Sequence, residues 1–128
     1  MSKLALRLIE ECKRTRDSIL DLGNCGLIKI PKEITNLHWL EELYLDGNVL
    51  LSDLNPLKKL TKLKSLTLTH TRVKSLEPIA ELHQIKFLAC SYTMVSDLRP
   101  ILHLIKNEVN VNWSPWDHRH GVNGIYIT

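Results

Sequence analysis

One apolar pattern recurs along the chain at an almost constant interval. Its clearest copy, at 40–50, reads L-x-x-L-x-L-x-x-N-x-L, and variants of it lie at 20–27, 63–73 and 85–95. The L-x-L cores begin at Leu20, Leu43, Leu66 and Leu88, so successive cores are 23, 23 and 22 residues apart. A weaker fifth core opens 21 residues later, at Val109. One such unit cannot bury its apolar side alone, so the regular interval predicts a stack of repeats.

The two-residue alternation within each core predicts a β-strand. In the clearest copy, Leu43 and Leu45 point to one face of such a strand. Glu42, Tyr44 and Asp46 then point to the other face. Stacked copies should form a parallel sheet with these side chains in line on its inner face: Leu22, Leu45, Leu68 and Cys90.

Asn48 stands where the chain leaves its strand and bends. A buried amide at this point can satisfy backbone groups that the bend leaves unpaired. The equivalent positions of the other copies hold Cys25, Thr71 and Thr93. The two threonines predict a slightly weaker ladder of hydrogen bonds without a change of fold.

The segments that return the chain between strands carry proline at a fixed place. The first has an I-P-x-x-I core at 30–34, and the next three have an L-x-P-[LI] core at 54–57, 76–79 and 98–101. Proline suits the first turn of a helix, where its missing N–H would have no partner. A repeat of about 22 residues leaves room only for short 3₁₀ or α turns on the convex side.

Residues 2–14 predict an amphipathic helix with Ser2 as a possible N-cap. Its apolar face is formed by Leu4, Leu8, Ile9 and Cys12. We expect this helix to cap the open end of the first repeat. A membrane-surface helix is the alternative, and the mixture of Glu10 and Glu11 with Lys13 and Arg14 argues against it.

The pattern resembles that of leucine-rich-repeat proteins over 18–111. The I-P-x-x-I segment is similar to bacterial leucine-rich repeats, and the L-x-P-[LI] segments are similar to the short internalin-like class. The resemblance implies an α/β solenoid with a parallel concave sheet, which binds another protein and is rarely catalytic. The chain also resembles the repeat domain that precedes a GTPase module in Roco-like proteins, but it contains no G-x-x-x-x-G-K-[ST] phosphate loop.

The length and composition predict one domain, 1–128. We expect a helical cap at 1–16, about five repeats at 17–111, and a loop with a closing strand at 112–128. A net charge of +3 does not indicate nucleic acid, and no apolar run is long enough to cross a membrane. Three cysteines without a C-x-x-C pair favour buried free thiols and a reducing, cytoplasmic compartment. A free C-terminal sheet edge leaves dimerisation open, so no oligomeric state is predicted.

The concave face is the principal candidate for function. Its N-terminal end is acidic and its C-terminal end is aromatic, a composition that suits a protein-binding surface. Another protein is expected to bind there, and the chain is either a free-standing interaction module or a part of a larger signalling protein. The predicted binding residues are Glu42, Tyr44, Asp46, Thr67, His70, Phe87, Tyr92 and Trp113. Most lysines fall on the return segments, so the convex side should be basic.

The alternative is a small metal-binding or hydrolytic site at 117–120, which reads Asp-His-Arg-His. An H-x-H pair beside a carboxylate could hold a metal ion or exchange protons. No third ligand is predictable nearby, so the favoured interpretation is a solvated loop on which Trp113 or Trp116 packs. We therefore expect no catalytic residue, no metal and no cofactor.

Overall fold

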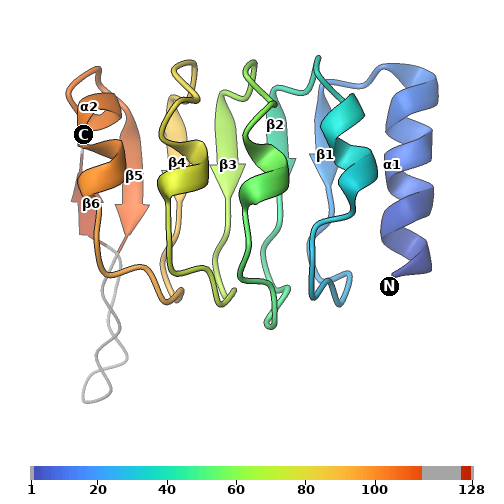
Figure 1. Ribbon diagram of the computed structural model, residues 1–128, viewed down its shortest axis with the longest axis horizontal. Coiled ribbons are helices and arrows are strands. Elements are labelled where there is room, and N and C mark those ends of the chain that lie inside the picture. Colours follow the sequence, from blue (N-terminus) through green and yellow to red (C-terminus); the bar gives the residue numbers. More distant parts are fainter. Residues whose placement is uncertain (1, 114–124, 128) are drawn as a thin grey trace.

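A computed structural model describes residues 2–113 and 125–127. Its elements stack along one axis, from helix α1 (Lys3–Thr15) at the N-terminal end to strands β5 (Asn110–Trp113) and β6 (Ile125–Ile127) at the other (Figure 1). Strands line one side and short helical turns line the opposite side. The predicted solenoid is confirmed.

Five strands form the predicted parallel sheet in sequence order. The first four are β1 (Ile19–Asp21), β2 (Glu42–Tyr44), β3 (Ser65–Thr67) and β4 (Phe87–Ala89). Strand β5 continues the parallel order, and β6 pairs with it antiparallel. Because the middle residue of each of the first four strands is in register with the next, these buried side chains stack in one row: Leu20, Leu43, Leu66, Leu88 and Val111.

The predicted register of the fifth copy is wrong. Val111, and not Val109, pairs with Leu88. Glu108, the residue before Val109, lies ahead of β5 with a positive φ of 67°. Val109 and Val111 are both buried.

The convex side consists of short turns, as predicted. They are η1 (Lys32–Asn36), η2 (Asn55–Leu57), η3 (Glu77–Ile79), η4 (Arg99–Ile101) and the single-turn helix α2 (Leu102–Ile105). Proline occupies the first turn of η2, η3 and η4. A side-chain oxygen just before each of these three turns accepts a hydrogen bond from the backbone N–H two residues later. These oxygens belong to Asp53, Ser75 and Asp97.

Helix α1 closes the N-terminal end of the core. Ser2 Oγ accepts the Ala5 N–H at 3.1 Å, which confirms the predicted N-cap. Ala5, Ile9 and Cys12 are buried, whereas Leu4, predicted on this face, is 52% exposed. The buried side chains follow an i, i+4, i+7 spacing, and Leu4 lies one residue off that stripe. None of the described helices is long and apolar enough to span a membrane.

The bend after β2 is held by Asn48, whose amide is fully buried. Its Oδ1 accepts the N–H groups of Cys25 and Leu27 at 3.1 and 2.9 Å. Its Nδ2 donates to the carbonyls of Leu22 and Leu45 at 3.0 and 2.8 Å. The amide therefore satisfies backbone groups of two adjacent repeats, and the predicted role is confirmed.

The three cysteine thiols are free. Cys12 and Cys90 are buried, which confirms the core position that the repeat predicts for Cys90. Cys25, which the repeat also places in the core, is partly exposed. Burial raises the pKa of the Cys90 thiol to about 12, so this thiol stays protonated and behaves as a small apolar side chain.

Candidate functional site: the concave face of the sheet

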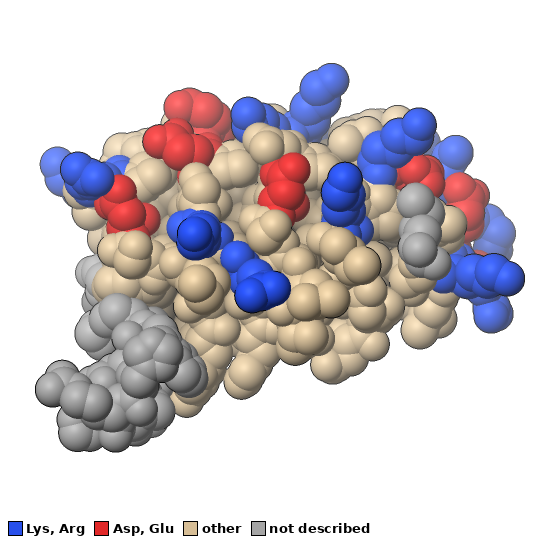
Figure 2. Space-filling view, turned by 60° about the horizontal axis from the view of Figure 1, so that its bottom comes forward, with Lys and Arg blue, Asp and Glu red and all other residues tan. Residues whose placement is uncertain are grey.

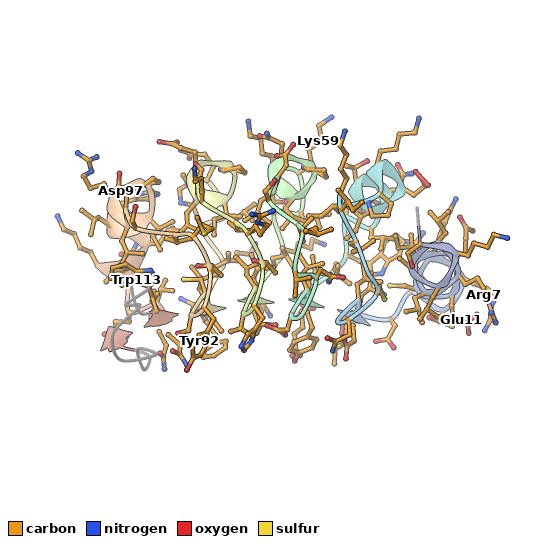
Figure 3. The ribbon with its side chains drawn as sticks, turned by 90° about the horizontal axis from the view of Figure 1, so that it is seen from below. Arg7, Glu11, Lys59, Tyr92, Asp97 and Trp113 are labelled. Atoms are coloured by element: carbon orange, nitrogen blue, oxygen red, sulfur yellow. The ribbon has the colours of Figure 1, made fainter. Side chains whose placement is uncertain are left out.

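The concave face is built from the outward residues of the strands and the residues that follow each strand. Figure 3 shows Tyr92 on the side of the sheet, below the strands, and Lys59 and Asp97 on the opposite, convex side. The register aligns Ile19, Glu42, Ser65, Phe87 and Asn110 in one row across this face. The neighbouring row contains Tyr44, Thr67 and Ala89.

The acidic side chains at the N-terminal end of this face are held by neighbours. Tyr44 Oη donates to Glu42 Oε1 at 2.7 Å. This hydrogen bond to a carboxylate is the largest cause of the raised pKa of Tyr44. Asp46 accepts the hydroxyl of Thr67 at 2.5 Å and both the hydroxyl and the N–H of Thr69, at 2.7 and 2.8 Å. These carboxylates therefore have fixed positions. Thr67, predicted as a binding residue, is buried and uses its hydroxyl within this network.

A row of left-handed residues follows the strands where the chain turns away from the concave face. Asn24, Gly47, His70 and Tyr92 have φ values of 54°, 78°, 58° and 55°. Such values are costly for residues other than glycine, and for a non-glycine residue they are held by the surrounding structure. At Gly47 a Cβ atom would collide with Asn24 Oδ1, so the Asn24 side chain lies over this glycine.

His70 and Tyr92 form a stacked pair within this row. Their ring centroids are 4.7 Å apart and their planes differ by 9°. Tyr92 is 37% exposed and His70 is also exposed. Both residues are among the predicted binding residues, but the repeat pattern did not predict that they stack. Their equivalent places in consecutive repeats, 22 residues apart, are the signal that could have shown it.

The aromatic end of the face is smaller than predicted. Phe87 is partly exposed on β4, between Ser65 and Asn110 in the register. Trp113, predicted on the concave face, instead occupies the place of Cys90 in its repeat and packs against the core. Its indole N–H donates to the Val95 carbonyl at 3.0 Å. The two-residue register error at Val109 is the reason for this misplacement.

The predicted alternative site at 117–120 lies outside the described residues. Within residues 2–113 and 125–127, no group of three or more His, Cys, Asp or Glu side chains is arranged to hold a metal ion.

The convex side is not uniformly basic. Lys32, Lys58, Lys59, Lys62 and Lys74 are exposed, as the return segments predict. Figure 2 shows Asp and Glu side chains between the Lys and Arg side chains over the upper part of the molecule. The charges are mixed, and this mixture does not give the continuous positive surface that nucleic acid requires.

Solved structures with this architecture include two internalins from Listeria monocytogenes. One, inlF, has 29% sequence identity and a TM-score of 0.58, with 74% of this chain and 26% of the inlF chain covered. The other, internalin C2, has 24% identity and a TM-score of 0.61, with 76% and 51% covered. This chain thus spans about a quarter to a half of their length. No family model and no curated protein sequence matches.

The repeats, the parallel sheet and these likenesses define the class. The chain is a bacterial-type leucine-rich-repeat protein with internalin-like short repeats.

Proposed function

We propose that this chain is a protein-interaction module that binds a partner protein through the concave face of its sheet. The observation that carries the proposal is the His70–Tyr92 pair, which is exposed at the rim of that face in strained backbone conformations. Exposed aromatic side chains held in a fixed orientation lose little conformational entropy on binding, and such residues commonly dominate the energy of interfaces.

The acidic end supports the same function in a different way. Glu42, Tyr44 and Asp46 are oriented by hydrogen bonds before any partner arrives. Charges at the edge of an interface mainly accelerate association and select a partner of opposite charge. The proposed partner is therefore a protein that meets Tyr92 with an apolar pocket and Glu42 with basic residues.

The proposal includes a binding rather than an enzymatic role. It also includes a cytoplasmic location, supported by the odd number of cysteines, and a part in signalling. The likeness to internalins supports a protein-interaction module in general terms. The Roco-like resemblance and the single-domain organisation remain proposals.

The test begins with a pull-down from the source cell, followed by titration of the purified partner. Tyr92→Ala and Phe87→Ala should each weaken binding by about 2 kcal/mol or more. Glu42→Gln should cost less than about 1 kcal/mol and lose that effect in high salt. Asp46→Asn is a poor test because Asp46 accepts three hydrogen bonds that maintain the fold.

Met94→Ala is the matched control, since Met94 is 51% exposed and lies on a loop beyond the concave face. Thermal melting of each variant separates binding from folding. If both aromatic variants bind as tightly as the unmodified chain, the concave face is not the binding surface.

A further inference from the structure

The loop after β2 is one residue longer than its equivalents. Five residues lie between the buried Leu45 and Leu51, whereas four lie between the corresponding buried residues of the other repeats. Those pairs are Leu22 and Leu27, Leu68 and Val73, and Cys90 and Val95. The repeat architecture does not need this additional residue, because three loops close without it.

The additional residue creates a turn with apolar side chains at its tip. The Leu51 N–H donates to the Asn48 carbonyl at 3.0 Å, which places Val49 and Leu50 at the two central positions. These side chains are 64% and 51% exposed. Central positions of turns favour Gly, Asn, Asp, Ser or Pro, and valine and leucine gain nothing there from the turn itself. Their exposure therefore suggests a contact with another molecule.

Ile28 extends this apolar tip into the preceding loop. It is 62% exposed, and the adjacent Leu27 N–H bonds to Asn48 Oδ1 at 2.9 Å. The same amide thus joins the two loops and fixes their relative position. We call Ile28, Val49 and Leu50 together the apolar turn patch.

A cleft of about 500 Å³ lies at Ile28 and is lined by Ser2 and residues 26–33. Buried Leu27, Ile30 and Pro31 form its apolar lining, and Lys29, Lys32 and Glu33 contribute polar groups. A concave apolar cavity of this size can accept one or two side chains of a bound segment. The patch and the cleft share Ile28, so one extended ligand can contact both.

Basic residues flank the patch and the cleft. Lys29 and Lys32 are exposed at the cleft. Arg72 is exposed in the next loop, where its backbone N–H donates to the Leu51 carbonyl at 2.8 Å. None of these three cations forms an ion pair within the described part of the chain.

Two acids stand nearby, Glu33 in the cleft and Asp53, which accepts the Asn55 N–H at 2.8 Å. Three cations against two acids leave a positive balance. Figure 2 turns the edge that carries these loops toward the reader and shows an uncharged stretch below the Lys and Arg side chains.

We infer that the apolar turn patch and the adjoining cleft bind a short peptide segment of a partner protein that combines apolar side chains with carboxylates. The apolar side chains fill the cleft and cover Val49 and Leu50, and the carboxylates meet Lys29, Lys32 and Arg72. A membrane surface would also attract basic and apolar residues. The cleft favours a peptide, because a bilayer surface supplies no single projecting side chain to fill it.

The test is a titration of the ¹⁵N-labelled chain with pooled eight-residue peptides that alternate Leu, Ile or Phe with Glu. Amide signals of 26–33 and 49–51 should shift on addition. Pools with Lys in place of Glu, or Ser in place of the apolar residues, should bind at least fivefold more weakly. Absence of shifts at millimolar concentration, or equal binding of the Lys pool, would overturn the inference.

Variants locate the contact. Val49→Ser with Leu50→Ser should weaken binding of the Glu pool at least fivefold, and so should Lys29→Glu with Lys32→Glu. Serine is favoured in turns, so the first double variant should keep the melting temperature. Met94→Ser is the matched control, because Met94 is equally exposed in the loop two repeats later. If Met94→Ser weakens binding as much, the patch is not a specific site.

Two further arms separate the alternatives. Vesicles of phosphatidylcholine and phosphatidylserine should not cosediment with the chain; cosedimentation that Val49→Ser with Leu50→Ser abolishes, without peptide binding, would replace the inference with a membrane contact. Tyr92→Ala should leave peptide binding at this patch unchanged, so failure here and failure of the concave-face proposal are distinguishable.

Discussion

The first and second halves of the solenoid differ in the side chain that holds the bend after each strand. In the first half, the Asn48 amide bonds to backbone groups of its own repeat and of the preceding one. In the second half, Thr93 donates to the Cys90 carbonyl at 2.7 Å and accepts the Val95 N–H at 3.2 Å. Thr71 makes the same two contacts, again within one repeat.

The difference follows from the longer side chain of asparagine compared with threonine. An asparagine amide has a donor and an acceptor at the end of a longer side chain, so it can reach the adjacent repeat. A threonine hydroxyl stands closer to its own backbone and bonds locally. At this position the first half therefore has a polar link between repeats that the second half lacks, and the side-chain bonds between repeats in the second half lie elsewhere, at Ser91, His103 and Trp113.

Asn48→Ala is the strongest test of this difference. It removes four hydrogen bonds and leaves buried backbone groups of two repeats without partners, so we expect a loss of about 3 kcal/mol in the free energy of unfolding. Thr93→Ala removes two local bonds and should cost about 1 kcal/mol. Urea unfolding measures both.

Hydrogen exchange gives the local control for this pair. In Asn48→Ala, the amides of Cys25 and Leu27 should exchange faster, because both bond to the deleted side chain. If the two alanine variants lose the same stability within about half a kcal/mol, the proposed difference between the halves is wrong.

Thr93→Asn should transfer the link to the second half. The preceding loop, from Leu68 to Val73, has the same five-residue interval as the loop that Asn48 contacts. A new amide there can accept from the N–H groups of Thr71 and Val73, so stability should rise by about 1 kcal/mol. Thermal melting and urea unfolding measure the change.

Thr71→Asn is the matched comparison for this gain. It would face the longer loop between Leu45 and Leu51, where the turn at Val49 and Leu50 changes the position of the backbone N–H groups. We expect no gain from that variant. A loss of stability in Thr93→Asn would show that the second half cannot accept the longer side chain.

The repeat architecture could be predicted from the sequence because its signal is redundant. Leu22, Leu45, Leu68 and Cys90 occupy one place in four copies, and an error in one copy leaves the others intact. The fifth copy failed because Val109 and Val111 are both buried and stand two residues apart. The apolar character of the two valines does not decide between them, whereas the interval from Leu88 to Val111 is 23 residues, the same as the first two intervals.

The sequence predicted which side chains lie on the concave face, but it did not predict the contacts between them. Alternation placed Glu42, Tyr44 and Asp46 on the concave side, where the structure has them. It could not show that Asp46 is committed to two threonines, since that depends on distances between repeats. Stacking of His70 on Tyr92 depends on backbone corners that alternation does not describe.

The smallest expected effect concerns the acid behaviour of the second half. Asp97 on the last return segment accepts hydrogen bonds from the Arg99 side chain at 2.8–3.1 Å and from its N–H at 2.9 Å. The Asp97 pKa is lowered from 3.8 to about 2, and the hydrogen bonds from the Arg99 side chain are the largest cause. Since the folded pKa is depressed, its stabilising effect is present above about pH 4 and is lost as the pH falls toward 2.

The Asp97→Asn variant should therefore melt slightly below the unmodified chain at pH 6, and this gap should close between pH 4 and pH 2. The gap is small because the pair is on the surface and is screened by water and salt. A carboxyl-carbon NMR titration should give a midpoint near 2, and Arg99→Gln should raise it toward 3.8. A midpoint that stays near 2 in Arg99→Gln would assign the effect to the backbone N–H, a local contact of the kind that Thr71 and Thr93 make.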